Sequence, residues 1–315
     1  MNTISITIIK NLKSARYTYF VIVYCILVFV AIVLTEKNTT ISDETLTKFG
    51  APTAVDIFGG KIWGVVTNSF VHLNFLHLIV NLITTLLIAS YVERRVGFWK
   101  LFAFGLVASM VSSAFQLSFS DDAGIGLSGV NYALFGFVFG KTFIDQRFKI
   151  VTKNIALLVM IFFIPFCEIM NRIYNWNVAT IALLMGFVFG FLFSGLFSKF
   201  RTQSLIILLL IFSFSILSVL YSPWSAEWNC SKGMELHESS KIKEAKEFYL
   251  KAVHLNPKAL CALDNLKLIR IDELSGKALQ LHLRGKYIEA GKIYDEILKI
   301  DPKNQWAFEN KRRLP

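Results

Sequence analysis

The feature that most limits what this chain can fold into is a series of long apolar runs in its first two thirds. Seven segments approach or reach the roughly 20 apolar residues that a helix needs to cross a bilayer. Inside a bilayer the backbone polar groups must be satisfied internally, which favours helices. We place these spans at 17–35, 70–91, 98–118, 127–143, 154–171, 178–198 and 203–221. The sequence therefore predicts an all-α, polytopic membrane helix bundle.

The basic residues indicate a membrane orientation rather than a nucleic-acid surface. The formal net charge is +11, but the cations lie mainly in short loops between the apolar runs, where they set orientation. With the N-terminus in the cytoplasm, twelve Lys and Arg residues fall in inner segments and four in outer loops. We therefore expect a multi-pass protein of a bacterial inner (plasma) membrane, in contact with the lipid bilayer and without a nucleic-acid partner. Seven spans then place the C-terminal tail outside the cytoplasm.

From about residue 223 the sequence becomes polar and contains an internal repeat. Ala, Tyr and Pro recur with one spacing in two segments that lie 45 residues apart, at Ala245, Tyr249 and Pro257 and at Ala290, Tyr294 and Pro302. This pattern resembles tetratricopeptide repeats, which are antiparallel helix pairs of about 34 residues. The resemblance implies a small α-helical repeat domain that binds a protein or peptide partner. The alternative is a small helical bundle that only caps the last span.

Two of the four cysteines, Cys230 and Cys261, lie in this tail. A disulfide between them can form if the tail is extracytoplasmic, because that compartment is oxidising. The spacing of Cys and His residues shows no metal-ligand pattern. We expect neither a metal nor a cofactor.

Several polar residues lie inside the predicted spans, where each is costly and needs a reason. The second span contains His72, His77 and Asn81, and the fourth contains Ser128 between glycines. His77 and Asn81 are four residues apart and therefore share one helix face. A serine beside such hydrogen-bond donors favours a catalytic site with a hole for an oxyanion. The alternative is structural, since a small residue between glycines commonly serves close helix packing.

The motifs around these residues resemble the rhomboid family of intramembrane serine proteases. The segment from Gly126 to Gly129 matches the family's G-x-S-G, and His72, His77 and Asn81 match its second-span signature. The resemblance covers about residues 60–198 and implies six core spans, to which this chain adds a seventh. It divides the chain into an N-terminal segment (1–58), a rhomboid-like core (59–200), a seventh span and linker (201–224) and the tail (225–315).

The resemblance also implies roles for individual residues. Ser128 would be the nucleophile, and His77, Asn81 and the backbone N–H of Ser128 would hold the oxyanion. The supporting motif residues are Gly126 and Gly129, which allow close backbone approach, Tyr132, which would flank the general base, and His72. The substrates would be transmembrane proteins cleaved in or near the bilayer.

The general base that a serine nucleophile requires is missing from the sixth span. In the family this base is a histidine. Aligning Asn177, Val178 and Ala179 with the family pattern puts Thr180 at its position, whereas aligning Gly186 and Gly190 puts Leu183 there. Two functions stay open. One is an intramembrane serine endopeptidase, in which His77 would turn from oxyanion donor to substitute base. The other is an inactive rhomboid-like pseudoprotease that binds transmembrane clients, with the tail contacting a partner.

Overall fold

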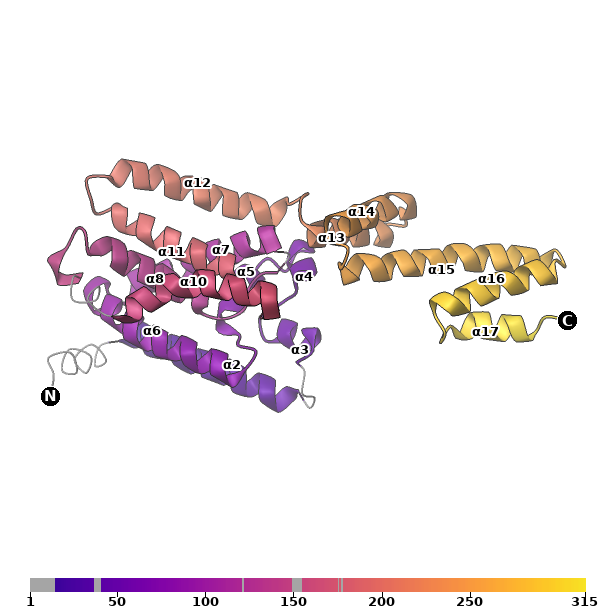
Figure 1. The fold of residues 1–315 in the computed structure, drawn as a ribbon, viewed down its shortest axis with the longest axis horizontal. Helices are drawn as coiled ribbons and strands as arrows, with labels where there is room; N and C mark the ends of the chain where they lie inside the picture. The colour runs from indigo at the N-terminus through magenta and orange to yellow at the C-terminus, as the bar shows by residue number, and fades with distance from the viewer. Residues whose placement is uncertain (1–14, 37–40, 121, 149–154, 175, 177) are drawn as a thin grey trace. The chain divides into compact units, whose positions relative to one another are not determined.

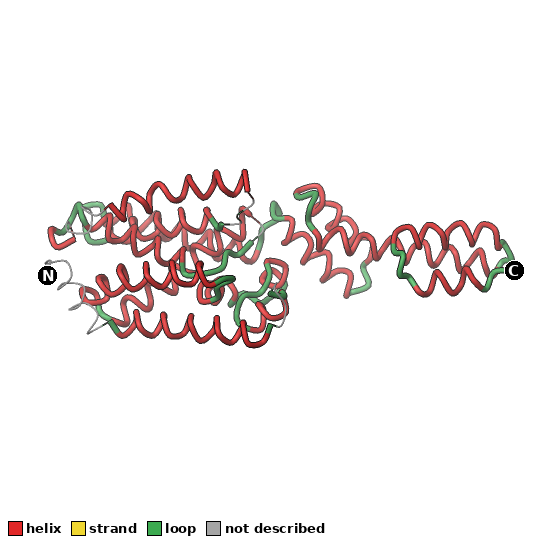
Figure 2. Tube along the Cα trace, turned by 60° about the horizontal axis from the view of Figure 1, so that its bottom comes forward, coloured by secondary structure: helices red, strands yellow, loops and turns green. Residues whose placement is uncertain are grey.

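The computed structural model describes residues 15–36, 41–120, 122–148, 155–174, 176 and 178–315. They divide into two compact units, Met1–Ser222 and Pro223–Pro315, and every element in the described part is a helix (Figure 2). Asn177 and five of the cations behind the predicted orientation lie outside the described residues; those cations are Lys10, Lys13, Lys37, Lys149 and Lys153.

Each predicted span contains a helix in the first unit (Figure 1). The helices are α2 (Arg16–Thr35), α6 (Phe75–Val96), α7 (Phe98–Ser120), α8 (Ser128–Lys141), α10 (Ile155–Tyr174), α11 (Thr180–Gly195) and α12 (Arg201–Leu220). Among the described residues, α2, α6, α7 and α12 are long and apolar enough to cross a membrane, whereas α8 and α11 have only 14 and 16 residues. The chain is an integral membrane protein, and its number of spans stays a prediction.

The second membrane helix begins later than the sequence predicted. The expected span started at residue 70, but the helix α6 starts at Phe75. Asn74 adopts an extended conformation and its side chain accepts a hydrogen bond from the His77 N–H at 2.8 Å. An asparagine in this position satisfies a donor that the first helical turn leaves unpaired. As a consequence, His72 lies in the loop before α6 and His77 lies in its first turn.

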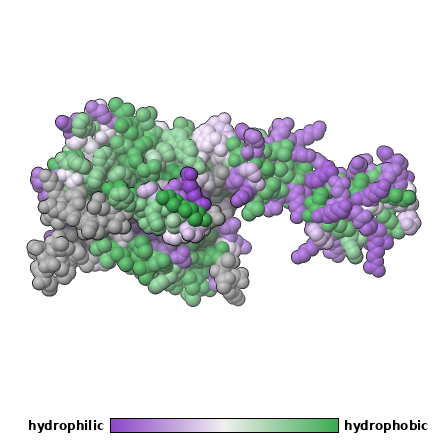
Figure 3. Space-filling model, in the orientation of Figure 1, coloured by the Kyte–Doolittle hydropathy of each residue, from purple (hydrophilic) through white to green (hydrophobic). Residues whose placement is uncertain are grey.

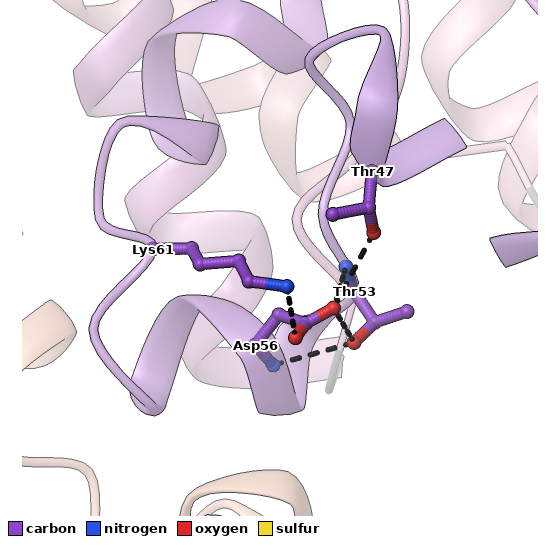
Figure 4. Close-up of polar contacts among 4 residues, drawn as sticks. All are labelled: Thr47, Thr53, Asp56 and Lys61. Carbon is purple, nitrogen blue, oxygen red and sulfur yellow. Dashed lines mark hydrogen bonds and ion pairs between the residues drawn. The ribbon is translucent and has the colours of Figure 1, made fainter. Parts of the chain in front are cut away.

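The loop between α2 and α6 is folded into short helices. These are α3 (Asp43–Lys48), α4 (Ala54–Phe58), α5 (Gly64–Thr67) and η1 (Asn68–Phe70). The Asp56 carboxylate holds the loop together by contacting Lys61 Nζ at 2.8 Å, Thr53 Oγ1 at 3.0 Å and Thr47 Oγ1 at 3.4 Å (Figure 4). Partial burial alone would raise the Asp56 pKa, but the hydrogen bonds from Lys61 and Thr53 outweigh it and lower the pKa below its ordinary value.

Glycines let α8 and α11 pack backbone against backbone. A Cβ added at Gly186 would collide with the carbonyl oxygen of Gly129, and one at Gly190 would collide with that of Ala133. Such contact between small residues is a common source of association between membrane helices, because apolar side chains gain little from leaving lipid. This packing fixes the start of α8, where Ser128 lies, against α11.

The tail contains two helical hairpins, α13–α14 and α15–α16, and the long helix α15 of the second also packs against the first. Its helices are α13 (Ala226–Glu238), α14 (Ile242–Leu255), α15 (Leu260–Leu283), α16 (Tyr287–Ile300) and α17 (Gln305–Arg312). Tyr249 is fully buried in one core with Ile269, and Tyr294 is fully buried in a second core with Ile271. The helix α15 therefore contributes to both cores. The classification of these hairpins as tetratricopeptide repeats stays a prediction.

A disulfide joins the first hairpin to α15. It links Cys230 on α13 to Cys261 on α15, with their Cα atoms 6.3 Å apart, so the pairing that the sequence allowed is formed. The two units also differ in surface character. In the view of Figure 3 the described surface of the membrane unit is mostly hydrophobic, whereas the tail is mostly hydrophilic with hydrophobic patches between.

Candidate active site

Ser128 is the first residue of α8 and is partly exposed. It lines a small pocket together with Ser69, Ser112, Gly126 and Ala179. The residue before the helix, Leu127, provides no side-chain cap, so the N–H groups of the first turn rely on other partners. The positive end of the helix dipole lies at the same place. Negative charge that develops next to Ser128 would therefore be stabilised.

The loop that leads to Ser128 packs directly on a histidine ring. Gly126 has a φ of +101°, and a Cβ added to it would lie 2.6 Å from His77 Cε1 and 2.8 Å from His77 Nε2. The imidazole of His77 therefore lies against the backbone two residues before Ser128. His72 is fully buried beside it, with the two ring centroids 5.0 Å apart, and the Leu127 N–H points to His72 Nε2 at 3.5 Å.

Asn81, the other expected oxyanion donor, belongs to a buried polar network between α6 and α8. Its amide Nδ2 donates to the His77 carbonyl oxygen at 2.9 Å. The Asn131 amide donates to the Asn81 side-chain and carbonyl oxygens, each at 3.2 Å, and the Thr85 hydroxyl donates to Asn131 Oδ1 at 2.8 Å. Sequence reasoning assigned no role to Asn131 or Thr85. Their polarity within apolar runs was the signal that could have found them.

Thr180 and Leu183, the two alternatives for the base position, have different surroundings. The Thr180 hydroxyl donates to the Glu168 carboxylate on α10 at 2.9 Å, and Glu168 also pairs with Arg172 at 2.9 Å. Leu183 is 1 % exposed and packs in one apolar cluster with Tyr132. The Tyr132 hydroxyl donates to the Met160 carbonyl oxygen at 2.9 Å. Neither position offers a side chain that accepts a proton near neutral pH.

Two further polar residues of α7 support the region and were missed by sequence reasoning. A Cβ added at Gly129 would lie 2.7 Å from Ser112 Cβ, so α7 and α8 are in close contact one residue after Ser128. Gln116 is buried, and its Oε1 accepts the Ala182 N–H of α11 at 3.0 Å. Gln116 thereby ties the first turn of α11 to α7. Its position within a predicted span was the available signal.

Comparison with known proteins shows which proteins this part of the chain is similar to. Residues 59–200 match the family described as "Rhomboid domain". The matched residues cover the helices α6, α7, α8, α10 and α11, in which the candidate site lies. The chain is 32 % identical over 126 residues to the rhomboid protease GlpG of Salmonella choleraesuis (strain SC-B67), and 31 % identical over 126 residues to that of Salmonella newport (strain SL254). Each alignment covers 40 % of this chain and 44 % of the relative, so the chain matches less than half the length of these proteins.

Proposed function

We propose that this rhomboid-type protein binds transmembrane segments of client proteins and has little or no peptidase activity. The observation that carries the proposal is the state of Leu183, which is 1 % exposed and packed with Tyr132 where a general base would be required. A serine hydroxyl is a weak nucleophile without an adjacent base. Removal of the histidine from a soluble serine protease costs about 10⁶ in turnover.

The contacts of α11 favour Leu183 over Thr180 as the position of the missing base. Tyr132 is the residue that the family resemblance places beside the base, and Leu183 is the one that shares its apolar cluster. Gly186 and Gly190, on which this alignment depends, both face the backbone of α8. Thr180 instead directs its hydroxyl to Glu168 on α10.

The second candidate function is intramembrane serine endopeptidase activity through Ser128. It is favoured by the partial exposure of Ser128 at the start of α8 and by the contact of His77 with Gly126. In this mechanism the Ser128 oxygen bonds to a peptide carbonyl carbon as its proton passes to water, and His77, Asn81 and the Ser128 N–H stabilise the oxyanion. The peptide C–N bond then breaks, and the amine leaves with a proton from water. Without a base, such groups retain about 10³–10⁴-fold catalysis over water, which is small for the slow hydrolysis of a peptide bond.

The tail suits a role in recruiting clients or partner proteins. Its two hairpins, packed on each other through α15, support the tetratricopeptide resemblance, and such repeats offer extended surfaces to peptides. The Cys230–Cys261 disulfide supports an extracytoplasmic tail, because disulfides persist in oxidising compartments. The expected bacterial plasma-membrane location and cytoplasmic N-terminus are part of the same proposal.

Labelling with a fluorophosphonate probe separates the two functions. We would compare the detergent-purified chain with Ser128→Ala, Leu183→His and Thr180→His. We expect no serine-dependent labelling of the unmodified chain and restored labelling in Leu183→His, which Ser128→Ala abolishes in the combined variant. Ser128-dependent labelling of the unmodified chain would instead support the endopeptidase. Restoration by Thr180→His alone would show that the alignment through Leu183 is wrong.

A further inference from the structure

The two hairpins of the tail contain the same turn, 45 residues apart. In the first turn the Ser240 N–H donates to the His237 carbonyl oxygen at 2.9 Å, and the Lys241 N–H donates to that of Leu236 at 2.9 Å. The second turn repeats both bonds, from Gly285 to His282 at 3.0 Å and from Lys286 to Leu281 at 2.9 Å. Ser240 and Gly285 have similar positive φ angles of 61° and 71°. The two turns therefore have matching backbones, and their side chains can be compared position by position.

The two turns carry different side chains, and the difference is not needed for either turn to fold. The first turn carries Glu238 and Lys243, and the second carries Leu283 and Ile288 at the equivalent positions. Leu283 is 78 % exposed and Ile288 is 81 % exposed. Since the first turn forms with charged residues at these positions, the apolar side chains are not needed to close the second. They leave apolar surface open to water, which indicates an interaction site when polar groups surround it.

The residues between the two apolar side chains are basic and aromatic. Arg284 and Lys286 are exposed, and Tyr287 is 40 % exposed. Lys286 contacts Glu289 at 3.2 Å, whereas Arg284 has no ion pair among the described residues. Large aliphatic side chains beside cations and an interfacial aromatic ring are typical of segments that insert shallowly into a membrane surface. The cations then meet the phosphate and carboxylate groups of anionic lipids.

We propose that the α15–α16 tip, formed by Leu283, Arg284, Lys286, Tyr287 and Ile288, docks on a bilayer surface that contains anionic lipid. Leu283 and Ile288 would enter the boundary between head groups and acyl chains, and Arg284 and Lys286 would lie at the head groups. The tail is covalently joined to the unit that contains the membrane helices. Docking is therefore an intramolecular event, for which a weak intrinsic affinity is sufficient. This role is independent of whether Ser128 is catalytic.

The test uses the full chain in vesicles with its disulfide intact. A polarity-sensitive fluorophore is attached to Leu283→Cys, or to Glu238→Cys as the matched control, in a background with Cys25→Ala and Cys167→Ala. Vesicles contain phosphatidylcholine alone or with about one quarter phosphatidylglycerol, plus a lipid with a quenching group. We expect at least twofold stronger quenching of the label at 283 than of that at 238 in the anionic vesicles. Adding Arg284→Ser and Ile288→Lys, as in the first turn, should abolish the difference.

Two outcomes would overturn the proposal. Equal quenching of the labels at 283 and 238 would mean that the tip stays in water. A blue-shifted label at 283 that lipid does not quench, and that strengthens with protein density, would mean that a second copy covers the tip. Circular dichroism of each variant checks that the tail remains helical. The first-turn residues used in the variant already support a matching backbone turn, so the variant is expected to fold.

Discussion

Gly126 is the residue on which the arrangement around Ser128 depends most directly. Replacement by alanine places a Cβ within 2.8 Å of two atoms of the His77 ring and keeps a φ of +101° that alanine disfavours. We expect Gly126→Ala to lower the free energy of unfolding by about 2–4 kcal/mol, from strain of about 1–2 kcal/mol at positive φ and a comparable cost of crowding. Thermal unfolding in detergent measures this change.

Gly60→Ala separates the two causes. Gly60 has a φ of +116°, but a Cβ there would meet no atom within 4 Å, so this variant reports backbone strain alone. Equal losses in Gly126→Ala and Gly60→Ala would contradict the inferred contact with His77. A larger loss in Gly126→Ala would support a ring that is held against the loop before Ser128.

Asp56 gives the loop between α2 and α6 a stability that depends on pH. Its pKa is lowered in the folded state because the Lys61 and Thr53 hydrogen bonds outweigh its partial burial. A lowered pKa stabilises the fold above the unfolded value of about 3.9, and this contribution is lost as pH falls through the folded value. Asp56→Asn should therefore cost about 1 kcal/mol at pH 7 through the lost ion pair and the weakened capping box with Thr53. The difference should shrink as pH falls below about 3.9 and vanish below the lowered folded pKa of Asp56.

Melting curves of the unmodified chain and Asp56→Asn between pH 7 and pH 3 check this prediction. Asp43→Asn removes a carboxylate charge from an exposed residue of the same loop and serves as the control. A difference that stays constant down to pH 3 would show that the Asp56 charge is not its source.

At the scale of elements, the α8–α11 contact should be the least tolerant of added volume. The colliding partner of a Cβ at Gly190 is the backbone of Ala133, which cannot move as a flexible side chain can. Gly190→Ala should destabilise the membrane unit by about 1–3 kcal/mol or more. Gly276→Ala is the matched control in helix α15, since a Cβ there meets nothing within 4 Å. It should stabilise the tail by about 0.5–1 kcal/mol, and thermal unfolding measures both.

The sequence predicted the elements better than it predicted their contacts. Apolar runs predicted a helix in every expected span, because the thickness and apolar interior of the bilayer set the length and hydropathy that a spanning helix needs. The later start of α6 was missed, since the cap at Asn74 is a local hydrogen bond within an apolar context. At the site, motif spacing selected Ser128, His77 and Asn81, but the engagement of Asn81 by Asn131 depends on how two helices pack. The spacing of residues within one helix does not show how that helix packs against another.

At the scale of the whole molecule, the disulfide should stabilise one half of the tail more than the other. Cys230 and Cys261 are 31 residues apart and flank the first core, whereas the second core, around Tyr294, contains no cysteine. Closing a loop of this length constrains the unfolded chain by about 3–4 kcal/mol. Reduction of the full chain, or the change of both cysteines to serine, should therefore loosen α13 and α14 more than α16 and α17.

Hydrogen exchange, measured separately for the two hairpins, tests this difference in stability. Alkylation of intact cells tests whether the disulfide is formed in the cell. If the tail lies in an oxidising compartment, a membrane-impermeant maleimide should label Cys261, which is partly exposed, only after treatment with a reductant. Equal acceleration of exchange in both hairpins would mean that α15 couples them into one cooperative unit. No labelling even after reduction would contradict the extracytoplasmic placement of the tail, whereas labelling without reductant would mean that the tail is outside but its disulfide is not formed in the cell.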